Sequence, residues 1–347
     1  MKGRGTDINP DNRFHRLHSQ DEDDGWYQET PANKVVTELY EDKAKTIIST
    51  NQSPDIPFDQ SINPYKGCEH GCIYCYARPS HEYLDLSAGL DFESKLFYKP
   101  NAAELLAQTF DKPGYQCSAI TIGANTDPYQ PIEKQLGITR ELLAVCLEYK
   151  HPVALITKGS LVLRDLDILS ELAKENLCRV MVSITTLDKN LKTKLEPRTA
   201  DPNARLRVID ALNQRHIPVG VLAAPMIPFI NDHELEAILA ECAQRQVVTV
   251  GYILLRLPLQ VADLFQHWLE QHFPQRAKRV MQTLQEMRGG KVYDAKFGER
   301  MTGKGVFAQL LRQRFHNARL KYQLSNDRGV MNTELFRPKP SPQMHLF

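Results

Sequence analysis

The sequence predicts an α/β fold in which a parallel sheet curves into a partial (β/α)6 barrel of the TIM type. Short apolar runs rich in β-branched residues alternate about six times with longer segments of helical period. The runs do not alternate apolar with polar residues, which is typical of parallel strands buried on both faces. The chemically suspicious residues all follow strands and should therefore meet at one rim. This placement favours a barrel over an open doubly wound sheet.

The elements follow one another along the chain as strand and then helix. A first strand is expected around residues 60–66. Further strands are predicted at residues 118–123, 152–157, 179–184, 218–223 and 247–254. Helices are predicted at residues 101–110, 131–149, 161–175, 202–215, 233–244, 259–273 and 277–288. Asp201 and Asn231 are expected to begin helices, because their side chains can accept hydrogen bonds from free N–H groups.

This pattern divides the chain of 347 residues into three regions. Residues 1–54 form a polar N-terminal extension, residues 55–260 the barrel, and residues 261–347 a helical and basic C-terminal extension. The segment before about residue 29 is poor in aliphatic side chains, so we expect it to be disordered or loosely attached. The last 60 or so residues are too polar for a core of their own and should pack on the barrel.

Charge is balanced overall but unevenly distributed. The chain has 43 Lys and Arg against 42 Asp and Glu, so its composition alone does not indicate a nucleic-acid-binding protein. Residues 1–60 carry a net charge of −5, and residues 288–340 carry +8. The basic segment is either a solvated helical face or a patch for a polyanionic substrate. Basic and aromatic residues alternate in Arg312-Gln-Arg314-Phe315 and Arg319-Leu-Lys321-Tyr322, as they could for phosphate and base contact.

The cellular environment bears on how the seven cysteines are interpreted. The N-terminus lacks the apolar run of a secretory signal, and no stretch approaches the roughly 18 apolar residues that cross a bilayer. We therefore expect a cytoplasmic protein without a membrane partner, in which disulfides are rare. Four cysteines are isolated in predicted strands or helices and are interpreted as core residues: Cys117, Cys146, Cys178 and Cys242.

The strongest chemical signal is the C-x3-C-x2-C cluster formed by Cys68, Cys72 and Cys75. Three thiolates within eight residues can bind one metal centre from a single loop. Structural zinc usually takes four protein ligands, and the sequence has no second cysteine pair. Three cysteines suit a [4Fe–4S] cluster in which one iron lacks a protein ligand. A zinc site and a chance spacing are the alternatives.

This loop, with aromatic Tyr74 before its last cysteine, resembles the signature of the radical S-adenosylmethionine (SAM) superfamily. The resemblance covers roughly residues 55–260. It implies that Cys68, Cys72 and Cys75 hold a [4Fe–4S] cluster whose open iron chelates the amino and carboxylate groups of SAM. An electron from the cluster then cleaves SAM and releases a 5′-deoxyadenosyl radical. A reducing partner such as flavodoxin or ferredoxin is implied as well.

The resemblance also implies roles for polar residues that follow the predicted strands. Asn125, Thr126 and Asp127 stand where the superfamily binds the SAM amino group, although an Asx-turn would also explain Asp127. Lys158 follows the third strand and would pair with the SAM carboxylate; a surface lysine is the alternative. Tyr74 and four residues after later strands complete the expected SAM contacts: Ser183, Glu196, Arg198 and Asn231. A simple ion pair is the alternative for Glu196 and Arg198, and Tyr252 and Arg256 are weaker candidates at the rim.

Within the superfamily, the set resembles the "DNA repair photolyase" type, the uncharacterised relatives of spore photoproduct lyase. The lyase returns a hydrogen atom from a cysteine, and that place is Ala124 here, so the repair reaction itself is not implied. Tyr129 is a speculative hydrogen-atom donor. Three functions remain open: a radical SAM enzyme acting on nucleic acid, one acting on a peptide or small molecule, or a non-catalytic iron–sulfur or zinc protein.

Overall fold

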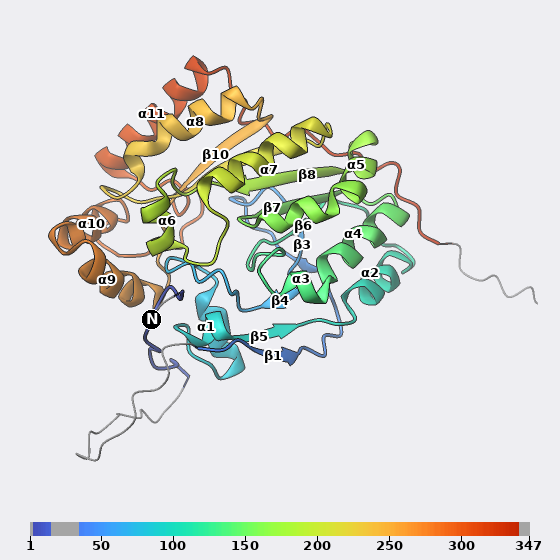
Figure 1. Cartoon of the computed structure of the whole chain (residues 1–347), viewed down its shortest axis with the longest axis horizontal. Helices are drawn as coiled ribbons and strands as arrows, with labels where there is room; N and C mark the ends of the chain where they lie inside the picture. The colour runs from blue at the N-terminus through green and yellow to red at the C-terminus, as the bar shows by residue number, and fades with distance from the viewer. Residues whose placement is uncertain (1–2, 15–34, 340–347) are drawn as a thin grey trace, which may run out of the picture.

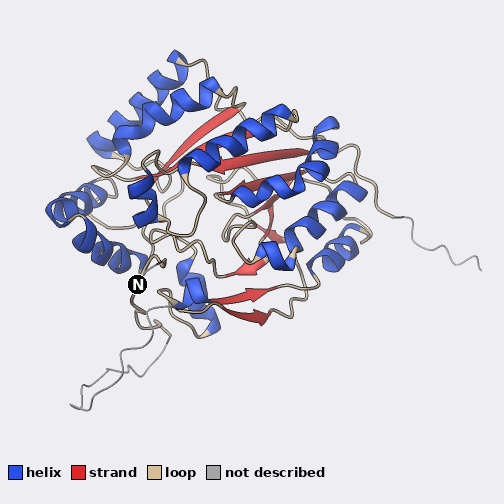
Figure 2. Ribbon diagram, in the orientation of Figure 1, coloured by secondary structure: helices blue, strands red, loops and turns tan. Residues whose placement is uncertain are grey.

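The computed structural model describes residues 3–14 and 35–339, and its main feature is a seven-stranded sheet (Figures 1 and 2). Six of its strands are parallel, and short β2 (Ser49–Thr50) pairs antiparallel with β3 at one edge. The parallel strands, in their order across the sheet, are β3 (Gln60–Ile62), β6 (Ile120–Ile122), β7 (Val153–Thr157), β8 (Cys178–Ser183), β9 (Val219–Met226) and β10 (Thr249–Leu254). Within the described residues β10 does not pair with the opposite edge, so the predicted partial barrel is confirmed.

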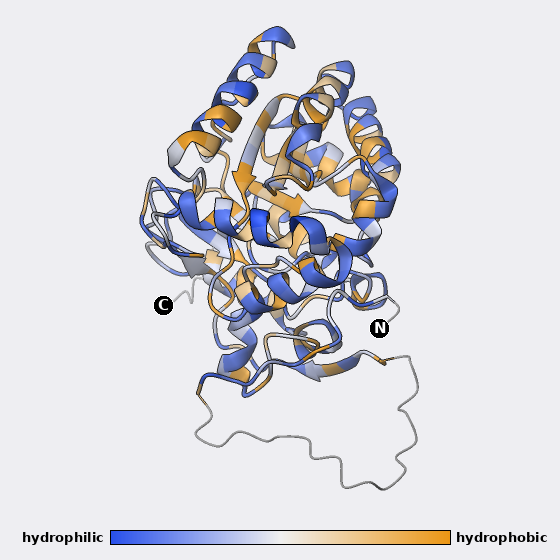
Figure 3. Cartoon of the chain, turned by 90° about the vertical axis from the view of Figure 1, so that its left-hand side faces the viewer, coloured by the Kyte–Doolittle hydropathy of each residue, from blue (hydrophilic) through white to orange (hydrophobic). Residues whose placement is uncertain are grey.

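Amphipathic helices cover the outer face of this sheet, and the apolar strands lie behind them (Figure 3). They are α2 (Ala102–Phe110), α4 (Ile138–Glu148), α5 (Leu166–Lys174), α7 (Pro202–Gln214) and α8 (Leu235–Gln244). The apolar sides of helices and strands form one continuous core, whose burial drives folding. The alternation of strand and helix therefore agrees with the sequence pattern.

Three helix predictions need correction at their starts. The helix expected over 131–149 is split into α3 (Glu133–Leu136) and α4 because Gly137 adopts a left-handed conformation with φ 69°. A 3₁₀ turn, Ser160–Asp165, precedes α5. Asp201 caps α7 as predicted, accepting a hydrogen bond of 2.9 Å from the Ala204 N–H. Asn231 caps no helix with its side chain, because its amide is bonded within the preceding loop.

A second, three-stranded sheet was not predicted. It consists of β1 (Glu38–Glu41), β5 (Lys95–Tyr98) and β4 (Tyr65–Lys66), and it lies beside α1 (Asp91–Ser94) and the 3₁₀ helix η1 (Arg78–Leu84). The N-terminal extension therefore contributes strands. It also packs tightly over residues 3–14, where Gly5 N–H donates to Glu93 and Asn12 donates to the Glu82 carbonyl. Loose attachment is wrong for these residues; the rest of that prediction falls on 15–34, outside the described part.

The C-terminal region packs on the barrel, as expected. It comprises α9 (Val261–His272), α10 (Pro274–Glu286), α11 (Gly305–Lys321) and an extended segment, 322–339. That segment crosses the N-terminal ends of the strands, where the Val250 N–H donates to the Ser325 carbonyl and Phe336 packs on His151. No helix among the described residues could cross a membrane.

The alternating basic and aromatic residues of α11 and its C-terminal end are not all free to contact phosphates and bases. Phe315 is buried against the Tyr252 ring, with centroids 4.8 Å apart, and Arg314 pairs with Glu236 at 2.6 Å. Tyr322 packs against the core. Arg314 and both aromatic rings therefore make contacts within the protein, whereas Arg312 and Lys321 are exposed. A solvated helical face and a patch for a polyanionic substrate both stay predictions for this segment.

Candidate functional site

The three cysteines lie on one loop that joins β4 to η1. Gly67 and Gly71 shape this loop with left-handed φ values of 80° and 65°. A Cβ on Gly67 would approach the Leu96 side chain to 2.7 Å, and one on Gly71 would approach Glu93 equally closely. Both positions therefore need glycine for backbone conformation and for space.

Buried polar side chains hold the cysteine loop from both sides. Arg78 donates to the Cys72 carbonyl at 3.0 Å and pairs with Glu93, and neither side chain of this pair is exposed. On the other side, the Gln130 amide oxygen accepts from the Glu69 N–H at 2.8 Å. Such bonds fix the loop backbone, because a buried polar group without its partner is costly. The sulfur atoms are therefore presented by a rigid support.

The three thiols are neighbours in a dry environment. Burial raises the pKa of Cys68 well above its usual value and that of Cys72 to about 12. The neighbouring thiols Cys72 and Cys75 contribute to the raised pKa of Cys68, and Cys75 contributes to that of Cys72. Metal binding would release their protons, since the thiolate is the ligand form. Among the described residues, no three His, Cys, Asp or Glu side chains are arranged around a site for a single metal ion. A [4Fe–4S] cluster does not require such an arrangement, because each thiolate binds a different iron.

A cavity of about 190 Å³ opens beside the cysteines at the carboxyl ends of the strands. Its wall comes from the cysteine loop, from the segment after β6, and from the C-terminal halves of β7, β8, β9 and β10 with the residues directly after β7 and β10, in agreement with the predicted rim. Eight wall residues were candidates from sequence: Cys72, Tyr74, Cys75, Asn125, Asp127, Lys158, Ser183 and Arg256. Ligand sites of α/β folds occur at this edge of the sheet.

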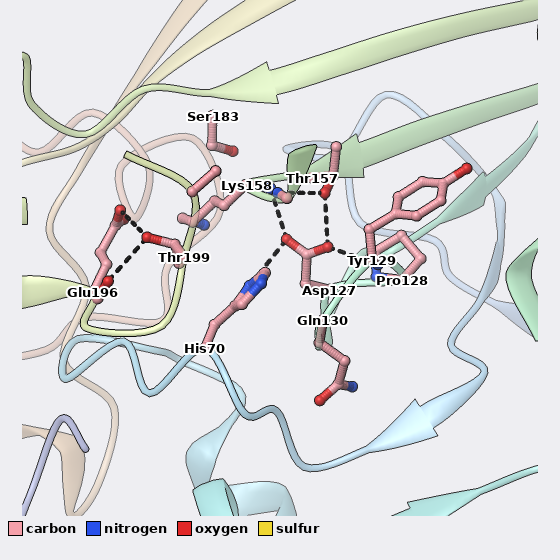
Figure 4. A network of polar contacts seen from close by, with 12 residues as sticks. His70, Asp127, Pro128, Tyr129, Gln130, Thr157, Lys158, Ser183, Glu196 and Thr199 are labelled. Carbon is pink, nitrogen blue, oxygen red and sulfur yellow. Dashed lines mark hydrogen bonds and ion pairs between the residues drawn. The ribbon is translucent and has the colours of Figure 1, made fainter. Parts of the chain in front are cut away.

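Lys158 is the chemically available cation of this cavity. Its backbone N–H donates to Asp127, but its ammonium group has no hydrogen bond or ion pair within the described residues. Burial lowers the pKa of Lys158, but the negative charges of Cys72, Glu196 and Asp127 outweigh burial and raise it overall. The amine therefore stays protonated and can receive an anionic group. The Ser183 hydroxyl, also without a hydrogen bond in the described chain, lies on the neighbouring strand (Figure 4).

Asp127 links the cysteine loop to the neighbouring strand end (Figure 4). One carboxylate oxygen accepts from the Thr157 hydroxyl at 2.7 Å, and the other accepts from the Lys158 N–H at 2.7 Å. The second oxygen also lies 3.3 Å from Nδ1 of His70. Although burial opposes it, contact with His70 and these donors lowers the pKa of Asp127 to about 2. Its oxygen atoms are thus mostly occupied by protein donors.

Glu196 is buried in a second network. It accepts from the hydroxyls of Tyr74 and Thr185 and pairs with Arg205, and none of its surface is exposed. Burial raises the pKa of Glu196, but Arg205, Lys158 and these hydroxyls bring it down to about 2. Arg198 pairs instead with Glu69 at 2.9 Å. Both candidates are thus in ion pairs, and neither lines the cavity.

Three other candidates also lie outside the cavity wall. The Asn231 amide bonds to the backbone of Ile227, Thr185 and Pro225, which fixes the loop after β9. The Thr126 hydroxyl donates to the Tyr65 carbonyl. The Tyr129 hydroxyl donates to Asp165 at 3.0 Å, and its ring points away from Lys158 (Figure 4). This geometry gives no support to a hydrogen-atom transfer by Tyr129.

Sequence reasoning missed several residues that build the site. His70 contacts Asp127, Gln130 accepts from the Glu69 N–H, and Arg205 pairs with Glu196. At the cavity mouth, the Arg256 guanidinium lies 5.1 Å from the centre of the Tyr76 ring, and both residues line the cavity. The position of Tyr76, directly after the last cysteine, was the only signal that could have singled it out.

Comparisons with known proteins agree with this geometry. The model of the radical SAM superfamily matches residues 62–242, more than half of the chain. An uncharacterised protein of Mycobacterium tuberculosis is 32% identical over 226 residues, which are 65% of this chain and 66% of that protein. An uncharacterised protein of Methanocaldococcus jannaschii is 28% identical over 238 residues, which are 69% of this chain and 85% of that protein. The chain thus spans 66% of the length of the mycobacterial relative.

Solved structures show the same architecture. Spore photoproduct lyase complexed with dinucleoside spore photoproduct superposes with a TM-score of 0.59 at 14% identity, covering 82% of this chain and 79% of the lyase. A double mutant of the lyase with bound AdoMet and the same dinucleoside gives a TM-score of 0.60, also at 14% identity and covering 82% of this chain and 78% of that one. At this identity the likeness shows the fold. The family match over more than half of the chain shows that the chain belongs to the radical SAM superfamily.

Proposed function

We propose that Cys68, Cys72 and Cys75 each ligate one iron of a [4Fe–4S] cluster and that SAM occupies the adjoining cavity. When bound, the cluster supplies the electron that cleaves SAM to a 5′-deoxyadenosyl radical, which removes a hydrogen atom from the substrate. The chain itself supplies the three thiolates, a rigid loop and a largely dry cavity. The buried Arg78–Glu93 pair and Gln130 keep the loop in place.

The unpaired ammonium group of Lys158 is the observation that carries this proposal. It lies in the wall of the cavity that also contains Cys72 and Cys75, and it has no carboxylate partner there. We assign it to the SAM carboxylate, with Ser183 and Asn125 as polar contacts to the remainder of the molecule. Asp127 and Glu196 act as positioning residues, because their oxygen atoms already accept protein hydrogen bonds.

Replacing Lys158 with methionine tests this assignment. The Asp127 contact to the backbone survives the change, so we expect the cluster to be retained while the dissociation constant for SAM rises roughly tenfold or more. Lys174→Met, at an exposed position at the end of α5, is the matched control and should bind SAM as the parent does. The measurement is equilibrium SAM binding together with the iron content. Unchanged affinity in Lys158→Met would remove this residue from the site.

The substrate should carry a group that Arg256 can meet. Arg256 stacks on Tyr76 in the cavity wall. Its guanidinium donates at 3.4 Å to the Met301 sulfur and the Tyr293 hydroxyl and has no carboxylate partner in the described chain. A phosphate or carboxylate on the substrate would satisfy it. We therefore propose an anionic substrate, with nucleic acid as one class and an acidic peptide or small molecule as the other. The reductant would be a small electron carrier such as flavodoxin or ferredoxin, in a cytoplasmic setting.

Isotope transfer identifies the substrate class. Deuterated pools of cellular DNA, RNA and peptides are incubated with reconstituted enzyme, SAM and dithionite, and the 5′-deoxyadenosine is analysed for deuterium. Label is expected from a nucleic-acid or an acidic peptide pool, and lost in Arg256→Met. Transfer solely from neutral molecules would contradict the role of Arg256.

A further inference from the structure

A second, larger cavity of about 740 Å³ lies at the opposite end of the same sheet. Along β8, Arg179, Met181 and Ser183 share one face, because side chains alternate along a strand. The first two line this cavity and Ser183 lines the cavity beside the cysteines. In the same way, Ala154 on β7 lines the larger cavity, and Lys158 directly after β7 lines the cavity beside the cysteines. The barrel interior therefore has one site at each end.

The C-terminal segment borders this second cavity. Residues 326–331 and Thr333 form part of its wall, and the Asn332 N–H anchors the segment by donating to the Asn176 carbonyl at 3.0 Å. The segment places Arg328 in the wall together with Arg179. These two cations come from regions about 150 residues apart, so sequence reasoning could not bring them together.

The two guanidinium groups lack counter-ions. In the described part of the chain neither forms a hydrogen bond or an ion pair, and the Arg179 Nε and the Ser118 hydroxyl are buried without partners. Burial lowers the pKa of Arg328, and the charge of Arg179 lowers it further. Asp327 acts on Arg179 only from beyond ion-pair distance, and Asp55, also in the wall, is paired with Arg300 at 2.6 Å. The cavity wall is thus electropositive, and its arginine groups have no hydrogen-bond acceptor in the described chain.

We infer that this cavity binds a small organic phosphate monoester. Two adjacent guanidinium groups match a dianion, and a phosphate monoester carries close to two negative charges at neutral pH. The volume falls within the roughly 300–1,000 Å³ of small-molecule sites. Phe58, Met181 and Met331 supply apolar surface for the organic part, and Ser118 supplies a hydroxyl. This inference is independent of the proposed radical chemistry at the other end of the barrel.

Phenyl phosphate is a suitable probe because it has an aromatic body, carries a dianion and lacks the adenine that could occupy the SAM cavity. Calorimetry and thermal unfolding of the full chain should show saturable binding of phenyl phosphate, weaker binding of inorganic phosphate and none of phenol. Arg179→Gln and Arg328→Gln should each weaken phenyl phosphate binding roughly tenfold or more. Arg215→Gln, an exposed change of equal charge at the end of α7, should bind as the parent does.

A stability readout separates loss of the site from loss of the fold. Because each arginine lacks a partner and repels the other, Arg328→Gln should not lower the midpoint of thermal unfolding without ligand. Retained SAM binding in this variant would show that the opposite cavity is intact. The inference fails if phenyl phosphate does not bind at millimolar concentration or if phenol binds equally well. It also fails if a variant that combines Arg179→Gln with Arg328→Gln binds phenyl phosphate like the parent.

Discussion

Changing Cys72 to alanine is expected to abolish the visible absorbance of reconstituted protein and its cleavage of SAM. Each thiolate binds one iron, so the two remaining thiolates would leave two irons of the cluster without a protein ligand. The fold should persist, since Cys72 makes no side-chain hydrogen bond in the described chain and the loop is held by Arg78, Glu93 and Gln130. The measurements are the absorbance spectrum, the iron content and circular dichroism.

Cys242→Ala is the matched control for this change. Cys242 is fully buried in α8 and belongs to the hydrophobic core. Its replacement also removes one cysteine sulfur, at a cost of about 1 kcal/mol in stability. The iron content should stay at the parent level. A Cys72→Ala protein that keeps the full visible band, or a Cys242→Ala protein that loses it, would contradict the ligand assignment.

Arg205→Met should produce the largest loss of stability. The change leaves the Glu196 carboxylate buried without its counter-ion, and it removes the bond of 2.9 Å from Arg205 to the Ser183 carbonyl. Breaking a buried ion pair in this way costs about 3–5 kcal/mol. Chemical denaturation measures the loss. Arg207→Met, an exposed position on the same helix, should change stability by less than about 0.5 kcal/mol.

A double variant distinguishes the unpaired charge from lost packing. Glu196→Gln together with Arg205→Met removes both charges, so it should be more stable than Arg205→Met alone. In the folded protein the pKa of Glu196 is about 2, below its usual value of 4.5. Its contribution is therefore complete above pH 4.5 and is lost as the pH falls towards 2. Equal stability of the single and double variants would show that the buried charge is not the cause.

Much of the fold was predictable because its signals are local. Each long apolar strand and its following helix leave a pattern within about 30 residues, and the C-x3-C-x2-C spacing is also local. The small sheet was missed because β4 has only two residues, and β1 pairs with β5, which lies more than 50 residues further along the chain. Elements this short have no readable periodicity.

The site was predicted in its residue types and only partly in their roles. Asp127, Glu196 and Asn231 were candidates because they stand where the resemblance places SAM contacts, but their hydrogen-bond partners come from other elements. Which carboxylate pairs with an arginine depends on tertiary packing. The sequence therefore does not distinguish a carboxylate that is free to bind a ligand from one in a buried ion pair. Lys158 was expected to pair with the SAM carboxylate, and it lines the cavity with no partner for its ammonium group among the described residues.

The most direct test of the central claim is reductive cleavage of SAM by the anaerobically reconstituted full chain. The account predicts iron and sulfide at about four each per protein and formation of 5′-deoxyadenosine that requires both dithionite and SAM. A colourless protein that binds one zinc ion, or an iron–sulfur protein that forms no 5′-deoxyadenosine under these conditions, would contradict it.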